Sequence, residues 1–277
     1  MKKIALMMGL LLGSSSVWAA PQSKPLSFFI NGGVQQYSYT EFAPQDEGGG
    51  KLMNISGMLW GVSAGANLQQ SLQYTTIEQM IKFAYFGGLD TKYDGRIQDG
   101  AAYSAPSNDY YFFTEYHLMP HIIHNDFFVL KADLGIGHRF LHNEVETSYR
   151  RSQHYLYFSS GLDGEVFVSP RTLIFSKIHY LGLLQGWHKT YLTDVGYDRD
   201  LNFTQDFGYG YRVELGLKRL LINSLAVELS AYYEFWNIGA SNFLTANKVE
   251  QNKVEQKEFF EPHNHTHTYG VQVGIRF

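Results

Sequence analysis

The chain ends in a stretch, Thr268 to Phe277, that reads Thr-Tyr-Gly-Val-Gln-Val-Gly-Ile-Arg-Phe and decides the fold. Every second residue, from Tyr269 to the terminal Phe277, is apolar, and polar or small residues stand between them. A period of two puts alternate side chains on opposite faces of an extended strand. The stretch therefore predicts a β-strand with one apolar and one polar face, and the same pattern recurs upstream.

The first 19 residues have the features of a secretory signal peptide. Two lysines, Lys2 and Lys3, precede an apolar stretch, and Val17-Trp18-Ala19 provides a small-residue cleavage site. The apolar stretch is too short to span a bilayer. We expect residues 1–19 to be a signal peptide and residues 20–277 to form a single domain.

Composition favours a membrane-spanning barrel over a soluble periplasmic domain. Aromatic residues make up 16% of the chain, with 20 Tyr and 20 Phe, whereas charged residues make up only 17%. Tyr and Phe gather at the bilayer interfaces of transmembrane barrels. The chain has 0 Cys, so disulfides and thiolate metal sites are excluded. The net charge of -4 argues against a nucleic-acid partner.

The alternation predicts an all-β, antiparallel, up-and-down transmembrane barrel of about ten strands; eight or twelve strands remain alternatives. Short and long connections alternate between the strands, as they do between the periplasmic turns and extracellular loops of such barrels. The expected strands span 26–39, 52–68, 77–86, 109–118, 127–140, 154–168, 173–185, 203–220, 225–237 and 268–277.

A closing strand that ends in an aromatic residue resembles the last strand of Gram-negative outer-membrane β-barrel proteins. The resemblance implies localisation in the bacterial outer membrane, among its lipids and lipopolysaccharide. It also implies that the barrel-insertion machinery recognises the strand ending at Phe277.

The strand face opposite the apolar one is expected to line the barrel interior. A ten-strand barrel is narrow and largely filled by side chains, so buried charges must pair with one another. We predict a salt-bridged plug formed by Glu78, Lys82, Glu115, Lys131, Asp133, Arg139, Asp163, Glu165, Lys177, Arg212, Glu214, Lys218, Glu228 and Glu234.

A tandem repeat marks the last long connection. The pentapeptide Asn247 to Gln251 recurs at once as Asn252 to Gln256. So short an insertion is tolerated where the backbone is solvated, and the repeat therefore predicts an exposed loop tip.

Three alternating histidines, His263, His265 and His267, would lie on one side of an extended chain, about 7 Å apart. This spacing can suit Zn or Cu. Their register directs them outward above Tyr269, where rim histidines are the simpler interpretation, so whether they bind a metal stays open.

Size, strand count and the stretch Glu47-Gly48-Gly49-Gly50-Lys51 resemble the omptin proteases, which are ten-stranded barrels. That resemblance implies an acidic pair in the second loop and an Asp-x-His pair in the fourth, which together activate a water. The second loop has no Asp-x-Asp and offers only Asp90, Asp94 and Asp99. The fourth loop has Asp198-Arg199-Asp200, and its histidine, His188, lies ten residues before Asp198. The catalytic pattern is not matched.

A lipid A-modifying hydrolase would need a His and a Ser near the outer leaflet. The nearest arrangements are His154 with Ser152, Ser159 and Ser160, and His138 beside Arg139. Neither has a convincing spacing.

The sequence thus predicts no catalytic set, cofactor site or metal site. We expect a non-enzymatic surface binding or adhesion protein whose long loops meet an extracellular ligand. The alternatives are a barrel hydrolase, omptin-like or lipid A-modifying, and a structural barrel or narrow channel.

Overall fold

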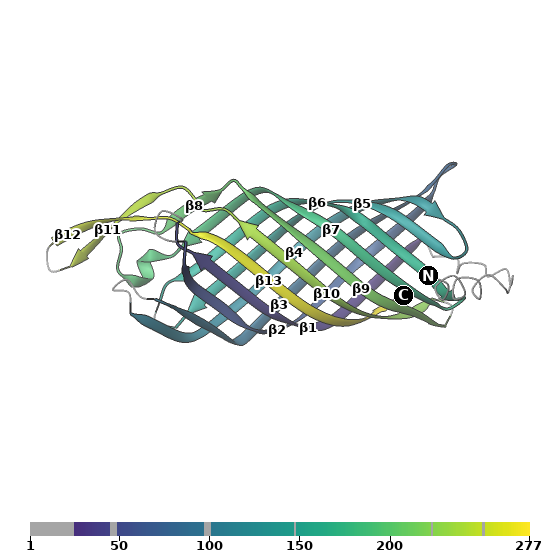
Figure 1. Cartoon of the computed structure of the whole chain (residues 1–277), viewed down its shortest axis with the longest axis horizontal. Helices are drawn as coiled ribbons and strands as arrows, with labels where there is room; N and C mark the ends of the chain where they lie inside the picture. Colours follow the sequence, from purple (N-terminus) through teal and green to yellow (C-terminus); the bar gives the residue numbers. More distant parts are fainter. Residues whose placement is uncertain (1–24, 45–48, 97–100, 147, 223, 251–252) are drawn as a thin grey trace, which may run out of the picture.

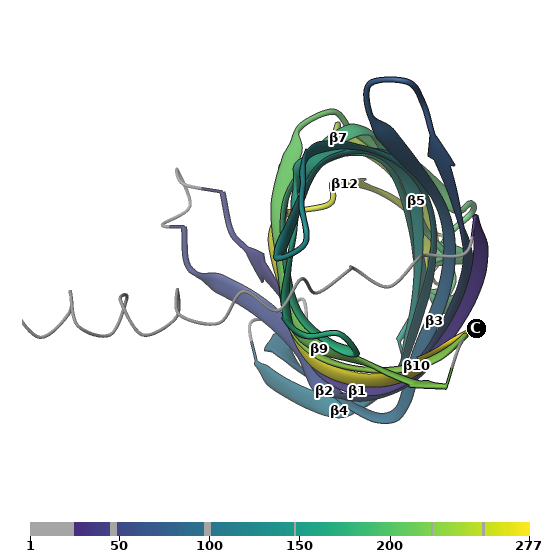
Figure 2. The ribbon, with the colours of Figure 1, turned by 90° about the vertical axis from the view of Figure 1, so that its right-hand side faces the viewer.

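The computed structural model describes residues 25–44, 49–96, 101–146, 148–222, 224–250 and 253–277. Ten long antiparallel strands close into a barrel, which Figure 1 shows from the side and Figure 2 end-on. They are β1 (Leu26–Phe42), β2 (Lys51–Ser71), β3 (Thr76–Arg96), β4 (Ala102–His124), β5 (Phe128–Val145), β6 (Arg150–Ser169), β7 (Thr172–Thr190), β9 (Gly208–Ile222), β10 (Leu225–Ile238) and β13 (His263–Arg276). The expected fold and strand number are confirmed. The predicted signal peptide lies outside the described residues.

Three further strands lie at one end of the barrel. The short strand β8 (Leu201–Gln205) pairs with β7 beyond the part of β7 that pairs with β9, so β8 continues the line of β9. The strands β11 (Leu244–Glu250) and β12 (Lys253–Phe259) form a separate hairpin. Among the described residues, no helix is both long and apolar enough to cross a membrane.

The two ends of the chain close the barrel. β1 pairs with β2 on one side and with β13 on the other, from Phe29 opposite Arg276 to Phe42 opposite His263. The terminal Phe277 exchanges two backbone hydrogen bonds of 2.9 Å with Phe28. The C-terminal stretch is therefore the closing strand, as its alternation predicted.

Short turns join the strands at the end where β1 begins and β13 ends, which we name the turn end; the opposite end, with β8, β11 and β12, is the loop end. In barrels of this class the short turns face the periplasm and the longer loops face outward. The turn end is therefore periplasmic and the loop end extracellular.

Several strands extend further toward the loop end than the sequence indicated. Residues 87–108 were expected to form a long loop, but β3 continues to Arg96 and β4 begins at Ala102. Residues 142–152 were also expected to be a loop, yet β5 reaches Val145 and β6 begins at Arg150. In these strands the hydrogen-bonded pairing continues beyond the apolar belt. The outward residues there are polar, so the sequence of the segment resembles that of a loop.

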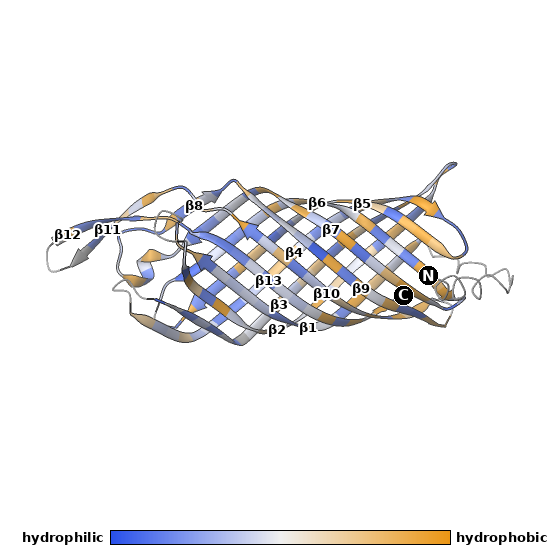
Figure 3. Cartoon of the chain, in the orientation of Figure 1, coloured by the Kyte–Doolittle hydropathy of each residue, from blue (hydrophilic) through white to orange (hydrophobic). Residues whose placement is uncertain are grey.

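Hydrophobic and hydrophilic residues alternate along the strands (Figure 3), so each strand has one apolar and one polar face. On β2 the outward Met58, Trp60 and Val62 are about half exposed, whereas Leu59 and Ser63 between them are buried. The exposed apolar residues on the outside of the strands form the belt that contacts lipid.

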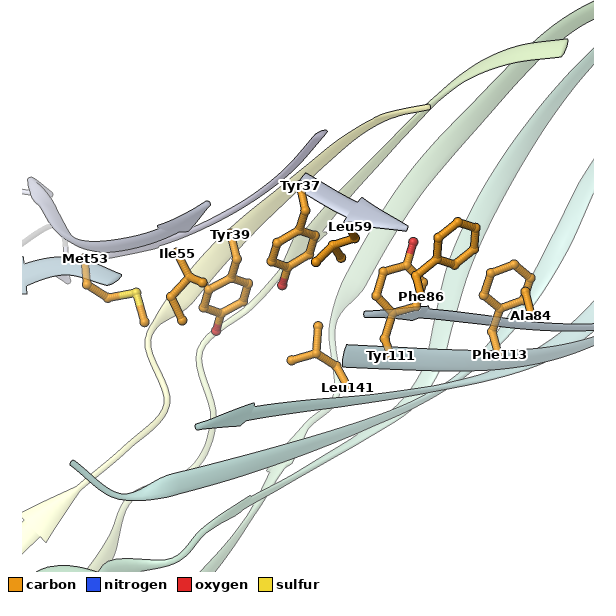
Figure 4. Close-up of a cluster of buried hydrophobic side chains, with 10 residues drawn as sticks. All are labelled: Tyr37, Tyr39, Met53, Ile55, Leu59, Ala84, Phe86, Tyr111, Phe113 and Leu141. Atoms are coloured by element: carbon orange, nitrogen blue, oxygen red, sulfur yellow. The ribbon is translucent and has the colours of Figure 1, made fainter. Parts of the chain in front are cut away.

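Near the loop end the polarity of the two faces inverts. On the same strand, Met53 and Ile55 point into the barrel, while Asn54 and Ser56 face outward. Figure 4 shows the resulting lumen cluster, which consists of Tyr37, Tyr39, Met53, Ile55, Leu59, Ala84, Phe86, Tyr111, Phe113 and Leu141. From the sequence we predicted only the charged plug, and this apolar lumen cluster lies beside it, where the outer face of the strands is polar and the inner face provides an apolar core.

In the middle of the barrel the predicted salt-bridged plug is confirmed. Arg212 lies 2.8 Å from Glu115 and 2.6 Å from Glu234, and Arg139 lies 3.5 Å from Glu234. The hydroxyl of Tyr157 donates a 2.6 Å hydrogen bond to Glu115. These contacts span strands on different sides of the barrel and fill its cross-section.

We predict that Arg212→Ala lowers the free energy of unfolding by about 3–5 kcal/mol, because it leaves two buried carboxylates without their main partner. Urea titration in lipid vesicles measures the change. Arg199→Ala is the control, since Arg199 is exposed and pairs with one neighbouring carboxylate, Asp198. Equal midpoints for the two variants would contradict a stabilising role for the plug.

Candidate functional site

At the loop end, the β7–β9 connection, which includes β8, and the β10–β13 connection fold together into a structure that we name the head. A short 3-10 helix, Leu192–Val195, ends at Gly196, whose φ of 87° is the left-handed conformation that glycine adopts readily. Buried side chains from both connections form a separate hydrophobic core, comprising Leu192, Tyr197, Leu201, Phe203 and Ala246, with Leu244 and Phe259 packed against it.

Ionic contacts attach this head to the barrel. Arg150, at the start of β6, donates two hydrogen bonds of 2.9 Å to Asp194. Asp200 accepts a 2.7 Å bond from the hydroxyl of Thr193 and lies 3.3 Å from Lys189. Two loop carboxylates therefore hold the fourth loop in place.

Asp198 fastens the β11–β12 hairpin to the fourth loop. Its carboxylate accepts bonds of 2.9 and 3.0 Å from the backbone and side chain of Asn247, and its own backbone N–H donates to the Asn247 carbonyl. A hydrogen bond from Arg199 lowers the pKa of Asp198 to about 2. So weak a base is poorly suited to activating a water at neutral pH.

The pentapeptide repeat forms the outer part of the β11–β12 hairpin. The backbone register places Lys248 opposite Glu255 and Val249 opposite Val254. The expected exposed loop tip is therefore two paired strands, and each copy supplies one of them, although residues 251–252 lie outside the described residues. A short period-two segment within a polar loop was not recognised as a strand in the sequence.

Below the head, a second buried polar cluster seals the lumen. Arg151 contacts Glu41 at 2.5 Å. The side chain of His188 is fully buried, with Nδ1 lying 3.2 Å from Glu261 Oε2. The hydroxyl of Thr190 donates a 2.5 Å bond to Glu261. Glu41, Arg151 and Glu261 form no recognisable motif in the sequence, because they come from strand ends and a connection far apart in the chain.

The structure separates the residues that a water-activating protease would need. His188 lies in this sealed cluster, whereas Asp198 and Asp200 are bonded within the head. In the second loop Asp94 pairs with Lys92 at 2.9 Å, and Asp90 is exposed. Asp99 lies outside the described residues, as do Glu47 and Gly48 of the glycine-rich stretch that resembled omptins.

The histidines considered for lipid hydrolysis face outward. The imidazoles of His138 and His154 lie 3.2 Å apart between their ring nitrogens. Ser159 and Arg139, in contrast, point into the lumen from the opposite face of their strands. In the part of the chain that the structure describes, no serine is hydrogen-bonded to His154.

The three alternating histidines lie on the outside of β13, as their register indicated. His263 is held by Asn237 at 2.5 Å, and His267 by the hydroxyl of Tyr233 at 2.9 Å. His265 packs between Phe42 and Phe235. These contacts build the three rings into the aromatic rim of the barrel.

Comparisons with known proteins support the fold. No protein-family model matches the sequence, and no curated protein matches it. Among solved structures, the outer membrane protease OmpT from Escherichia coli is similar, with a TM-score of 0.61 and 10% identity over 95% of this chain and 99% of that chain. The translocator domain of the autotransporter NalP from Neisseria meningitidis has a TM-score of 0.40 and 14% identity, over 99% and 96% of the two chains. The chain has the fold of bacterial outer-membrane β-barrels, and its apolar outer belt suits a lipid bilayer.

Because Glu261 is buried, we expect the stability of the folded protein to depend on pH. Burial and the neighbouring Glu41 raise its pKa from 4.5 to about 8, although Arg151 opposes them. The folded state therefore binds this proton more tightly than the unfolded state, and the stability that it contributes below pH 4.5 is lost as the pH rises to about 8.

We expect Glu261→Gln to match the parent protein near pH 4 and to become the more stable of the two as the pH rises, by up to about 1.4 kcal/mol per pH unit. Urea midpoints between pH 4 and 9 measure the difference. Glu258→Gln, which changes an exposed carboxylate of β12, is the control. If Glu261→Gln and the parent protein differed in stability by the same amount at every pH, the raised pKa of Glu261 would be refuted.

Proposed function

We propose that this outer-membrane barrel is a non-enzymatic surface binding protein whose head engages an extracellular ligand. The observation that carries the proposal is the separate hydrophobic core of the head, built on Leu192, Tyr197 and Phe203 beyond the barrel. A barrel needs no such core to cross a membrane. A core of this kind serves to hold a projecting surface in one shape.

Preorganisation favours binding, because a rigid surface loses less conformational entropy when a ligand docks. The hydrogen bonds from Arg150 to Asp194 and from Asn247 to Asp198 fix both connections of the head to each other and to β6. The hairpin β11–β12 therefore presents a defined surface at the extracellular end.

Exposed apolar groups of the head provide contact area. Phe243 and Val254 are 58% and 68% exposed. Phe243 stacks near Phe260, with ring centroids 4.9 Å apart. Aromatic side chains are enriched at protein interfaces, and a projecting aromatic pair outside the lipid belt supports an interaction site.

The closed lumen argues against the alternative of a narrow channel. Arg212, Glu115 and Glu234 fill the middle of the barrel, and Glu41 and Arg151 close it again below the head. A solute would have to break both buried ionic layers to pass.

Deletion of residues 247–256 is expected to leave the barrel folded and to weaken attachment to the ligand surface at least ten-fold. Leu244 and Phe259 remain to cover the core of the head. Phe243→Ala, a smaller change, should weaken attachment in the same direction. Binding of cells or refolded protein to host-matrix and glycan arrays provides the measurement.

Tyr74→Ala is the control, because Tyr74 is an aromatic residue even more exposed than Phe243 and lies in a turn at the periplasmic end. If the deletion and the control bind alike, the head is not the binding site. Incubation of the folded protein with a peptide pool and with purified lipopolysaccharide tests the hydrolase alternative. New fragments detected by mass spectrometry would overturn the non-enzymatic proposal.

A further inference from the structure

Four consecutive strands each bring one titratable side chain to the same point in the lumen. They are His117 on β4, Asp133 on β5, Asp163 on β6 and His179 on β7, and all four are buried. His117 Nδ1 lies 2.6 Å from Asp133 Oδ1, and His179 Nε2 lies 2.8 Å from Asp163 Oδ1. The cluster borders the plug, because His117 Nε2 lies 3.6 Å from Glu115 Oε2, and the predicted plug residues Asp133 and Asp163 pair here with histidines.

The two aspartates make their direct ionic contacts with histidines, although Lys131 and Lys177 lie opposite Asp163 on the neighbouring strands. Lys131 pairs with Glu78 and Glu165. Over the described residues, neither aspartate forms an ion pair with a lysine or arginine; their ionic partners are the two histidines. Buried carboxylates without a compensating cation are costly, so the cluster calls for positive charge.

One ligand atom of the cluster is unused. Asp133 is 1% exposed, and its Oδ2 has no hydrogen-bond partner among the described residues. This oxygen is directed at His179 Nε2, 3.5 Å away. A buried carboxylate oxygen without a hydrogen bond, facing an imidazole nitrogen, offers the donor pair that a divalent cation binds.

The spacing of the donor atoms suits a metal ion. Asp133, Asp163 and His179 each offer one ligand atom, and these three atoms lie within 4.8 Å of one another. Zinc binds imidazole nitrogen and carboxylate oxygen at about 2.0–2.2 Å, so tetrahedral ligand atoms stand about 3.4 Å apart. Asp133 Oδ2 and His179 Nε2 are 3.5 Å apart, close to this value. His179 Nε2 and Asp163 Oδ1 are 2.8 Å apart, and this distance would lengthen by about 0.6 Å when the proton between them leaves.

We propose that Asp133, Asp163 and His179 bind one divalent transition-metal ion of the zinc type inside the barrel. His117 is a positioning residue, because its Nδ1–H holds the second oxygen of Asp133 and so directs Oδ2 at the ion. The proposal is independent of the function of the head.

The fold provides both the space and the route. A Cβ on Gly161 would lie 2.2 Å from the ring of His179, so only glycine lets this imidazole cross β6 toward Asp133. A cavity of about 590 Å³ extends from turn-end residues such as Ser224 and Phe277 inward to Asp163. The cavity therefore provides a route from the periplasmic end as far as Asp163, the one proposed ligand that lines it.

The test uses the full mature chain, refolded in detergent, with the outer histidines removed by His263→Gln, His265→Gln and His267→Gln. Calorimetric titration with Zn²⁺ alone is expected to show one ion per chain in this background. Adding His179→Gln should weaken binding at least 100-fold, and adding His117→Gln about 10–100-fold. His188→Gln, which replaces a buried lumen histidine outside the cluster, should leave the affinity unchanged.

Zinc binding that disappears with the three outer histidines would overturn the proposal, as would equal affinities of the His179→Gln and His188→Gln variants. Folding of each variant is checked by its heat-dependent mobility in gels. X-ray absorption of the zinc-loaded background protein provides a readout that needs no lumen substitution. One imidazole with oxygen ligands agrees with the site, and a shell of several imidazoles contradicts it.

Discussion

The structure depends on completing every backbone hydrogen bond between strands within the bilayer. Unpaired N–H and C=O groups in hydrocarbon cost several kcal/mol each, so an open sheet edge cannot persist there. β1 and β13 meet this requirement by pairing along their length, with Phe28 and Phe277 completing the last pair. Closure also forces every second side chain inward, whatever its polarity.

The inward residues meet three different requirements along the barrel. Near the periplasm they line an open cavity, in the middle they cross the lumen as ion pairs, and beyond the bilayer they form a hydrophobic core. The order of these three interiors along the barrel follows what surrounds it. Where lipid surrounds the barrel, the interior can be polar; where water surrounds it, an apolar interior is favoured. The head continues the last arrangement, with its own small core above the lumen seal.

Much of the fold could be predicted from period-two alternation, because alternation within lipid is strict. Strand number, the outward face of β2 and the inward charges such as Arg212 and Glu115 followed from it. The extensions of β3 and β4 did not, because outside the bilayer the polar face changes sides and the pattern is no longer distinct. The clusters around Glu261 and Asp133 were also beyond the sequence. They join residues from several strands whose register is fixed only when the barrel closes.

The hairpin of the head has a symmetry that bears on how its length can evolve. Read backwards, the unit Asn-Lys-Val-Glu-Gln exchanges Asn with Gln and Lys with Glu, and an antiparallel pairing reads one strand backwards against the other. The observed register, Asn247 opposite Gln256 and Lys248 opposite Glu255, follows from this property. The same matching holds for any number of tandem copies, odd or even, and each added copy lengthens the hairpin by about 8 Å at roughly 3.3 Å per residue. A slip in copying a short DNA repeat can therefore change how far the protein reaches from the cell without disturbing a single cross-strand match.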